Sequence, residues 1–123
     1  MLVIAGHDPT GGAGIIADAQ AISIMGAHPV TVVSALTEQD THRVSGFEMV
    51  DTELVLRQIE TLTKDINFAA VKVGMLASNS LVQAVAPVLR NLQIPIVLDP
   101  VLASGAGDSL ADDGLVDVIC EYL

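Results

Sequence analysis

Four short segments of the sequence carry residues that could line a site for a small polar ligand. They are residues 7–8, 37–40, 74–75 and 99–100, which read His-Asp, Thr-Glu-Gln-Asp, Gly-Met and Asp-Pro. Carboxylates and amides hydrogen-bond polar groups, and a carboxylate can also bind magnesium. Each segment ends or follows a short apolar run, so each is expected at the end of a buried strand. The pattern predicts binding of a small polar molecule.

A glycine-rich loop follows the first of these segments. Residues 12–17, Gly-Ala-Gly-Ile-Ile-Ala, match the dinucleotide fingerprint G-x-G-x-x-A, in which backbone amides approach a pyrophosphate at a helix N-terminus. That fingerprint needs its glycines directly after the strand, whereas residues 7–11 intervene here, so the spacing argues against a nicotinamide site. The P-loop pattern G-x-x-x-x-G-K-S/T is absent. The glycines also fit a simpler role, in which they turn the chain and let helix and strand pack closely.

Apolar runs that alternate with helical periodicity predict how the chain positions these segments. Strands are expected at residues 2–5, 29–36, 69–75 and 94–99, with a short extended segment at 46–50. Helices are expected at 13–25, after a cap at Asp51 or Thr52, after a cap at Ser78 or Ser80, and at 112–122. Strands joined by helical crossovers form parallel sheets, whose ligands bind at the carboxyl ends of the strands. We therefore predict an α/β fold with a mostly parallel sheet, helices on both faces, and all four segments at one edge.

The composition narrows the class of protein further. The 123 residues suffice for one domain, and the 51% hydrophobic residues include two Phe, one Tyr and no Trp, so the core must be aliphatic. A net charge of −10 disfavours nucleic acid and anionic membranes as partners. The single Cys120 excludes an internal disulfide, and no signal peptide or apolar run of about 18 residues occurs. A cytoplasmic location is therefore expected.

Four ordered blocks of the sequence resemble a known enzyme family. Residues 7–18, 35–41, 72–76 and 98–101 are similar, in order and separation, to the ribokinase-like hydroxymethylpyrimidine/phosphomethylpyrimidine kinases of thiamine synthesis. The resemblance covers residues 1–123 as the N-terminal, substrate-side part of such a kinase domain, which is C-terminally incomplete here. It implies transfer of the ATP γ-phosphate, with Mg²⁺, to 4-amino-5-hydroxymethyl-2-methylpyrimidine and to its monophosphate.

The resemblance also implies which residues surround the substrate. Those expected to bind the pyrimidine are Ala13, Asp18, Thr37, Gln39, Met75 and Val101, and those expected near the phosphates and magnesium are Asp99 and Lys72. Asp18 would meet the hydroxymethyl group or the ring amine, and Gln39 would read the ring nitrogens. Simpler interpretations stay open, since Asp18 also suits the dipole of a helix N-terminus, and Met75 also suits a core position.

Lys72 is an unusual residue, because it places a cation inside an otherwise apolar strand. An unpaired buried ammonium is costly, so an acidic partner is expected, either Asp99 or Asp40. A structural ion pair is thus an alternative to a phosphate contact.

Two further patterns are not assigned to the chemistry. Residues 105–108, Gly-Ala-Gly-Asp, spell the catalytic signature of the sugar kinases in the wider ribokinase group. They follow the strand end at 99–101 directly, so we interpret them as a loop near the site. His7, His28 and His42 show no metal-ligand spacing with one another or with the cysteine. No catalytic residue and no metal ligand is assigned within the chain.

The family's remaining apparatus lies, by the resemblance, beyond the point that matches Leu123. It comprises the adenine pocket, an Asn-x-x-Glu segment that organises magnesium, and an anion hole with its base. We therefore expect no phosphoryl transfer by this chain alone. Two alternatives to the pyrimidine kinase stay open: a pyridoxal kinase of the same superfamily, and a catalytically dead binding or dimerisation module. An open sheet edge is also expected, and with it homo-oligomerisation.

Overall fold

A computed structural model gives the fold and describes residues 1–103, 107 and 110–123. The elements in chain order are β1 (Leu2–His7), α1 (Gly14–Ile24), β2 (Val30–Gln39), β3 (Val44–Met49), α2 (Thr52–Asp65), β4 (Val71–Val73), α3 (Asn79–Asn91), β5 (Ile96–Leu98) and α4 (Leu115–Tyr122). Among the described residues, no helix has both the length and the apolar character needed to cross a membrane.

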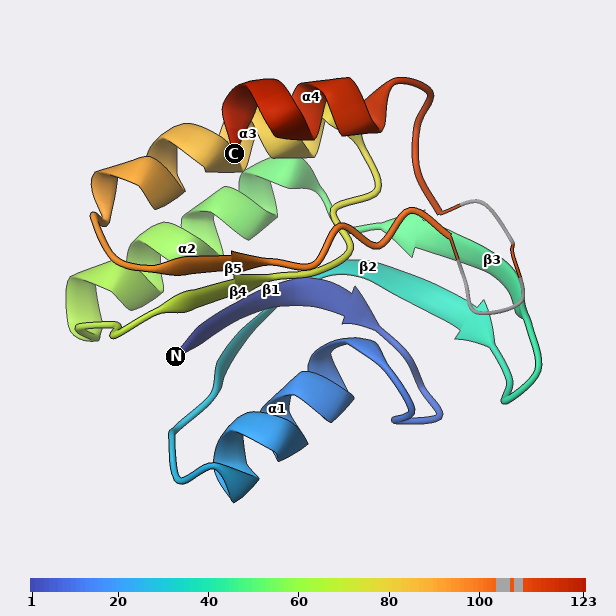
Figure 1. The fold of residues 1–123 in the computed structure, drawn as a ribbon, viewed down its shortest axis with the longest axis horizontal. Coiled ribbons are helices and arrows are strands. Elements are labelled where there is room, and N and C mark those ends of the chain that lie inside the picture. The colour runs from blue at the N-terminus through green and yellow to red at the C-terminus, as the bar shows by residue number, and fades with distance from the viewer. Residues whose placement is uncertain (104–106, 108–109) are drawn as a thin grey trace.

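Within these residues the strands form one mixed sheet, in the order β3-β2-β1-β4-β5 (Figure 1). β1 pairs in parallel with β2 and with β4, and β4 pairs in parallel with β5, so the predicted mostly parallel sheet is confirmed. β3 runs antiparallel to β2. This strand was expected only as a short extended segment at 46–50. It begins earlier because the hairpin pairing continues to Gln39 and Val44.

Helices cover both faces of the sheet, as predicted (Figure 1). α1 lies on one face, and α2, α3 and α4 lie together on the other. Side chains alternate along a strand, so Leu2 and Ile4 of β1 join the larger core under the three helices. Val3 and Ala5 instead pack with Ile15 of α1. The apolar first strand is therefore buried on both faces, as in other parallel sheets.

The first residues of α2 and α3 show which of the alternative N-cap residues is used in each helix. The Asp51 side chain accepts a hydrogen bond of 2.9 Å from the Leu54 amide, and this bond opens α2. The Ser78 hydroxyl accepts one of 3.2 Å from the Leu81 amide, and this bond opens α3. α1 begins at Gly14, and its N-cap residue Ala13 provides no side-chain hydrogen bond. Its start is instead fixed by the glycine loop described below.

The two strands that follow β1 in the sheet order are short. β4 and β5 pair over three residues each, from Val71 and Ile96 to Val73 and Leu98. The predicted strands at 69–75 and 94–99 were longer, because an apolar run alone does not show where ladder pairing stops. The residues that follow the paired residues of β4 and β5 form loops at the carboxyl edge of the sheet.

The sheet ends at β3 on one side and β5 on the other. In the part of the chain that the structure describes, no strand pairs with the outer side of β5. Val97 on this edge is 54% exposed. Within the described residues, β5 is therefore an edge strand of the sheet.

Candidate functional site

A cavity of about 240 Å³ lies where the carboxyl ends of β1, β2, β4 and β5 meet the start of α1. All eight residues expected at the site line this cavity: Ala13, Asp18, Thr37, Gln39, Lys72, Met75, Asp99 and Val101. The other lining residues are Ala5, Gly6, Asp8, Gly14, Ala17 and Leu110. The sheet thus brings together residues that are up to 105 positions apart, from Ala5 to Leu110.

The glycine loop forms one wall of the cavity and is braced by Asp8, which is only 4% exposed. Its carboxylate accepts hydrogen bonds from the Thr10 amide at 2.7 Å and the Thr10 hydroxyl at 3.0 Å. Gly14 then bridges back to His7 with φ of +58°. A Cβ at Gly14 would lie 2.2 Å from the Gly6 carbonyl oxygen, so only glycine fits. The loop is closed against β1 by these contacts.

Thr37 and Gln39 form the wall on β2. The Thr37 hydroxyl lies 2.9 Å from the His7 carbonyl oxygen and 2.8 Å from Gln39 Oε1. One hydroxyl hydrogen serves one acceptor at a time. Turning the Gln39 amide by 180° lets its NH₂ donate to the hydroxyl, which then donates to His7. Either orientation anchors the amide plane and leaves its other end for a donor or acceptor on a ligand.

Met75 gives the cavity an apolar wall. It is 5% exposed and packs in a small core cluster with Leu110, against which Val101 also packs. The Ser34 hydroxyl donates a 2.5 Å hydrogen bond to the Met75 carbonyl oxygen and ties this residue to β2. The thioether lies so close to Gly6 that a Cβ there would be 3.0 Å from Sδ. Met75 is therefore both a core residue and a cavity wall.

The charged end of the cavity is built around Lys72. Its ammonium is 2.7 Å from Asp18 Oδ2 and 3.7 Å from Asp99 Oδ2. The predicted pairing with Asp99 is confirmed. The alternative pairing with Asp40 is wrong, because the Asp40 carboxylate is bound within its own hairpin turn. The shortest contact, to Asp18, was not predicted.

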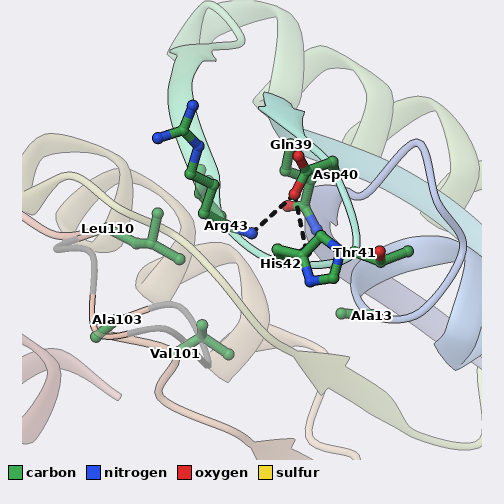
Figure 2. A pocket seen from close by; sticks show the side chains of 10 residues that line it. Ala13, Gln39, Asp40, Thr41, His42, Arg43, Val101, Ala103 and Leu110 are labelled. Carbon is green, nitrogen blue, oxygen red and sulfur yellow. Dashed lines mark hydrogen bonds between the residues drawn. The ribbon is translucent and has the colours of Figure 1, made fainter.

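A second hollow, of about 400 Å³, adjoins the cavity beneath the β2–β3 hairpin (Figure 2). It shares four lining residues with the cavity: Ala13, Gln39, Val101 and Leu110. In Figure 2 the His42 ring points toward Thr41 and Ala13, and the Arg43 guanidinium points away from Val101. The hairpin therefore borders the approach to the inner cavity.

Asp40 shapes the turn of this hairpin. Its carboxylate accepts hydrogen bonds from the His42 amide at 2.8 Å and the Arg43 amide at 2.9 Å. These amides, His42 first, lower the pKa of Asp40 below 3.8. A carboxyl with a lowered pKa supports the folded turn above its unfolded pKa and loses that contribution as the pH falls through the lowered value.

We therefore expect an acid titration of the Asp40 side-chain carbon, followed by NMR, to show a midpoint below 3.8. The amide shifts of His42 and Arg43 should follow the same midpoint, because those amides donate to the titrating group. A midpoint in or above the usual range of an aspartate would contradict the lowering of its pKa by these two amides.

Among the carboxylates that line the cavity, that of Asp99 is exposed enough to suit a divalent cation. The described residues contain no group of three or more His, Cys, Asp or Glu side chains that could hold a metal ion. The Asp99 carboxylate lines the cavity and is 63% exposed. It fits magnesium, which is usually held by one or two carboxylates together with phosphate oxygens and water.

Gly105, Ala106 and Asp108 of the sugar-kinase signature lie outside the described residues.

Asp8 and Leu110 line the cavity but were not among the eight residues expected to bind there, although Asp8 lies in the predicted segment 7–8. Asp8 had a local signal, since an aspartate followed by Thr10 and Gly11 after a strand is typical of an Asx turn. Leu110 had none, because it comes from a segment with no predicted element. Only the packing of the chain places it opposite Met75.

Comparisons with known proteins identify the family of the chain. Residues 8–123 match the family model of phosphomethylpyrimidine kinase. The chain is 42% identical over its full length to a hydroxymethylpyrimidine/phosphomethylpyrimidine kinase of Mycobacterium leprae, of which it covers 45%. It is 39% identical to the Escherichia coli enzyme of that name, over 94% of the chain and 44% of the relative.

The fold of the chain is similar to those of solved kinase structures. A phosphomethylpyrimidine kinase of Clostridium difficile superposes with a TM-score of 0.88 at 34% identity, over 98% of this chain and 53% of that one. A Staphylococcus aureus pyridoxal kinase in complex with AMP-PCP and pyridoxal has a TM-score of 0.82 at 24% identity, over 99% and 43% of the two chains. The second likeness concerns the fold alone. The chain spans about half the length of these relatives. It belongs to the phosphomethylpyrimidine kinase family.

Proposed function

We propose that residues 1–123 form the substrate-side part of a kinase that phosphorylates 4-amino-5-hydroxymethyl-2-methylpyrimidine and its monophosphate in thiamine biosynthesis. The observation that carries the proposal is the convergence of all eight predicted residues on one cavity. Its volume of about 240 Å³ lies below the range of about 300–1,000 Å³ typical of drug-sized ligands. A single substituted ring suits this space better than a dinucleotide does.

The chemistry of the walls suits an aminopyrimidine. Met75 and Val101 offer apolar surface to the ring, and the Gln39 amide offers hydrogen bonds in the plane of a ring edge. The Asp18 carboxylate accepts from an amino or hydroxyl group. A heteroaromatic ring with both donors and acceptors satisfies all of these groups at once.

ATP and Mg²⁺ are the proposed cofactors of the intact enzyme. Asp99 would supply a carboxylate ligand to the metal at the open end of the cavity. When bound, Mg²⁺ neutralises the charge of the phosphates during transfer. We also propose that the open edge of β5 supports self-association of the chain.

The Gln39→Leu substitution tests the pyrimidine site. Leucine leaves the polar groups of the ligand unpaired, so binding should weaken by about 1–3 kcal/mol. Titration calorimetry with the hydroxymethylpyrimidine measures this loss, and thermal unfolding shows whether the fold is retained. Gln83→Leu is the matched control, since Gln83 is exposed on α3. This helix lies on the face of the sheet opposite α1 (Figure 1).

Competition with pyridoxal separates the alternatives. Displacement of the pyrimidine by excess pyridoxal, with tighter pyridoxal binding, would favour a pyridoxal kinase. Absence of binding by either compound would overturn the proposal in favour of an interaction module. If Gln39→Leu and Gln83→Leu bind equally well, Gln39 has no role in reading the ring.

A further inference from the structure

Lys72 occupies an unusual position in the sheet. It lies in the middle of β4 between two fully buried valines, Val71 and Val73. Its register partners are Val3 on β1 and Val97 on β5. Alternation along the strands therefore directs Lys72 to the face covered by α1. The side chain is only 15% exposed, so its charge needs compensation inside the protein.

The carboxylates of Asp18 and Asp99 compensate the charge of Lys72 to different degrees. The distance of 2.7 Å to Asp18 Oδ2 is that of a charge-assisted hydrogen bond. The distance of 3.7 Å to Asp99 Oδ2 is too long for a hydrogen bond. Asp18 is 21% exposed and Asp99 is 63% exposed, so solvent screens the second contact more. The ammonium is thus committed to Asp18.

The neighbouring chain leaves room for this ammonium. A Cβ at Gly74 would lie 2.9 Å from Lys72 Nζ and 3.1 Å from the Ala5 side chain. The φ of Gly74 lies outside the left-handed range, so a side chain there would displace the ammonium rather than strain the backbone. Two features of the fold therefore place the ammonium against Asp18: the alternation of β4 and the missing side chain at Gly74.

We propose that Lys72 is a positioning residue that fixes Asp18 as a hydrogen-bond acceptor on the cavity wall. This inference rests on the proposed function and deepens it. Lys72 holds Oδ2 at 2.7 Å, and Oδ1 is the oxygen that would accept from a ligand. A carboxylate held in this way accepts and does not donate. The cavity consequently selects ligands that present an amino or hydroxyl hydrogen to Asp18.

A direct phosphate contact fits Lys72 less well. One ammonium faces two carboxylates, Asp18 and Asp99, so the cluster carries a formal charge of −1. An anion is not attracted to such a cluster by Coulomb forces. A hydrogen-bond donor, or a cation bound at Asp99, is the favoured neighbour.

The Lys72→Met substitution tests the inference. We expect it to weaken binding of the hydroxymethylpyrimidine about tenfold or more, because the acceptor is no longer held in place. Lys64→Met is the matched control, since it makes the same chemical change at an exposed residue in the last turn of α2. The control should bind as the wild type does. Calorimetry at one fixed pH above 7 measures all three proteins.

Two ligand analogues distinguish positioning from a general structural role. One lacks the amino group, and the other lacks the hydroxyl group. The loss caused by Lys72→Met should vanish for the analogue that lacks the donor bound by Asp18, and persist for the other. Equal losses with both analogues would mean that the substitution only disturbs the fold, and would overturn the inference.

A double variant covers the case in which Lys72→Met does not fold. The variant with Asp18→Asn and Lys72→Met removes both charges and leaves no carboxylate unpaired at Asp18. It should bind the pyrimidine as weakly as Asp18→Asn alone, because Lys72 acts through Asp18. A further loss in the double variant would overturn the inference.

The outcomes also separate this inference from the proposed function. If the wild type binds the pyrimidine and Lys72→Met binds it equally well, the positioning role is wrong and the proposed function stands. If the wild type binds neither the hydroxymethylpyrimidine nor either of its two analogues, the proposed function fails and the positioning role fails with it.

Discussion

Replacing Gly14 with alanine is expected to lower the free energy of unfolding by about 3 kcal/mol or more. Two effects add at this position. The φ of +58° lies in the left-handed region, where a side chain costs about 1–2 kcal/mol. The new Cβ would also lie 2.2 Å from the Gly6 carbonyl oxygen, so the loop must move away from β1. The movement displaces a cavity wall, and pyrimidine binding should be lost too. Urea unfolding and calorimetry measure the two effects.

Gly26→Ala is the matched control for this substitution. Gly26 has a similar φ of +83°, but a Cβ there meets nothing within 4 Å. Its cost should be limited to the backbone term of about 1–2 kcal/mol, with binding retained. Equal destabilisation by Gly14→Ala and Gly26→Ala would show that the close approach of Gly14 to Gly6 is relieved at no cost.

Replacing Leu81 with alanine is expected to destabilise the fold by about 2–5 kcal/mol. Leu81 on α3 is fully buried in the larger core, which also contains Leu2 and Ile59. The truncation removes buried methyl groups and leaves a cavity that a closely packed interior fills only in part. Domains of this size are stable by about 5–15 kcal/mol, so the loss is a large fraction of the total. Urea denaturation of the variant measures it.

Leu54→Ala provides the comparison, because Leu54 on α2 is 40% exposed. The same atoms are removed there with a smaller loss of buried area than at Leu81, so the cost should stay below about 1.5 kcal/mol. Binding of the pyrimidine should persist in this variant. Similar costs for Leu81→Ala and Leu54→Ala would contradict the difference in burial between the two side chains.

The convergence of the site could be predicted from sequence because it follows from a general property of parallel sheets. Apolar runs mark the buried strands, and the residues just after them meet at one edge. Gln39, Met75 and Asp99 were placed by this rule together with the resemblance to a family. The hairpin was only partly anticipated. The extended segment at 46–50 was recognised, but its antiparallel pairing with β2 depends on a turn held by Asp40 and not on an apolar run.

Residues 71–73 alone show that β4 carries a cation between apolar residues, and that this cation needs an acidic partner. The identity of that partner depends on the packing of the elements. The alternation of β4 turns Lys72 to the α1 face, but the crossing of α1 over the sheet brings Asp18, 54 residues away in sequence, to 2.7 Å. Local patterns carry the direction of a side chain, because strand and helix periods are fixed. Which side chain on another element becomes its partner depends on how the two elements pack together. No local pattern specifies that packing.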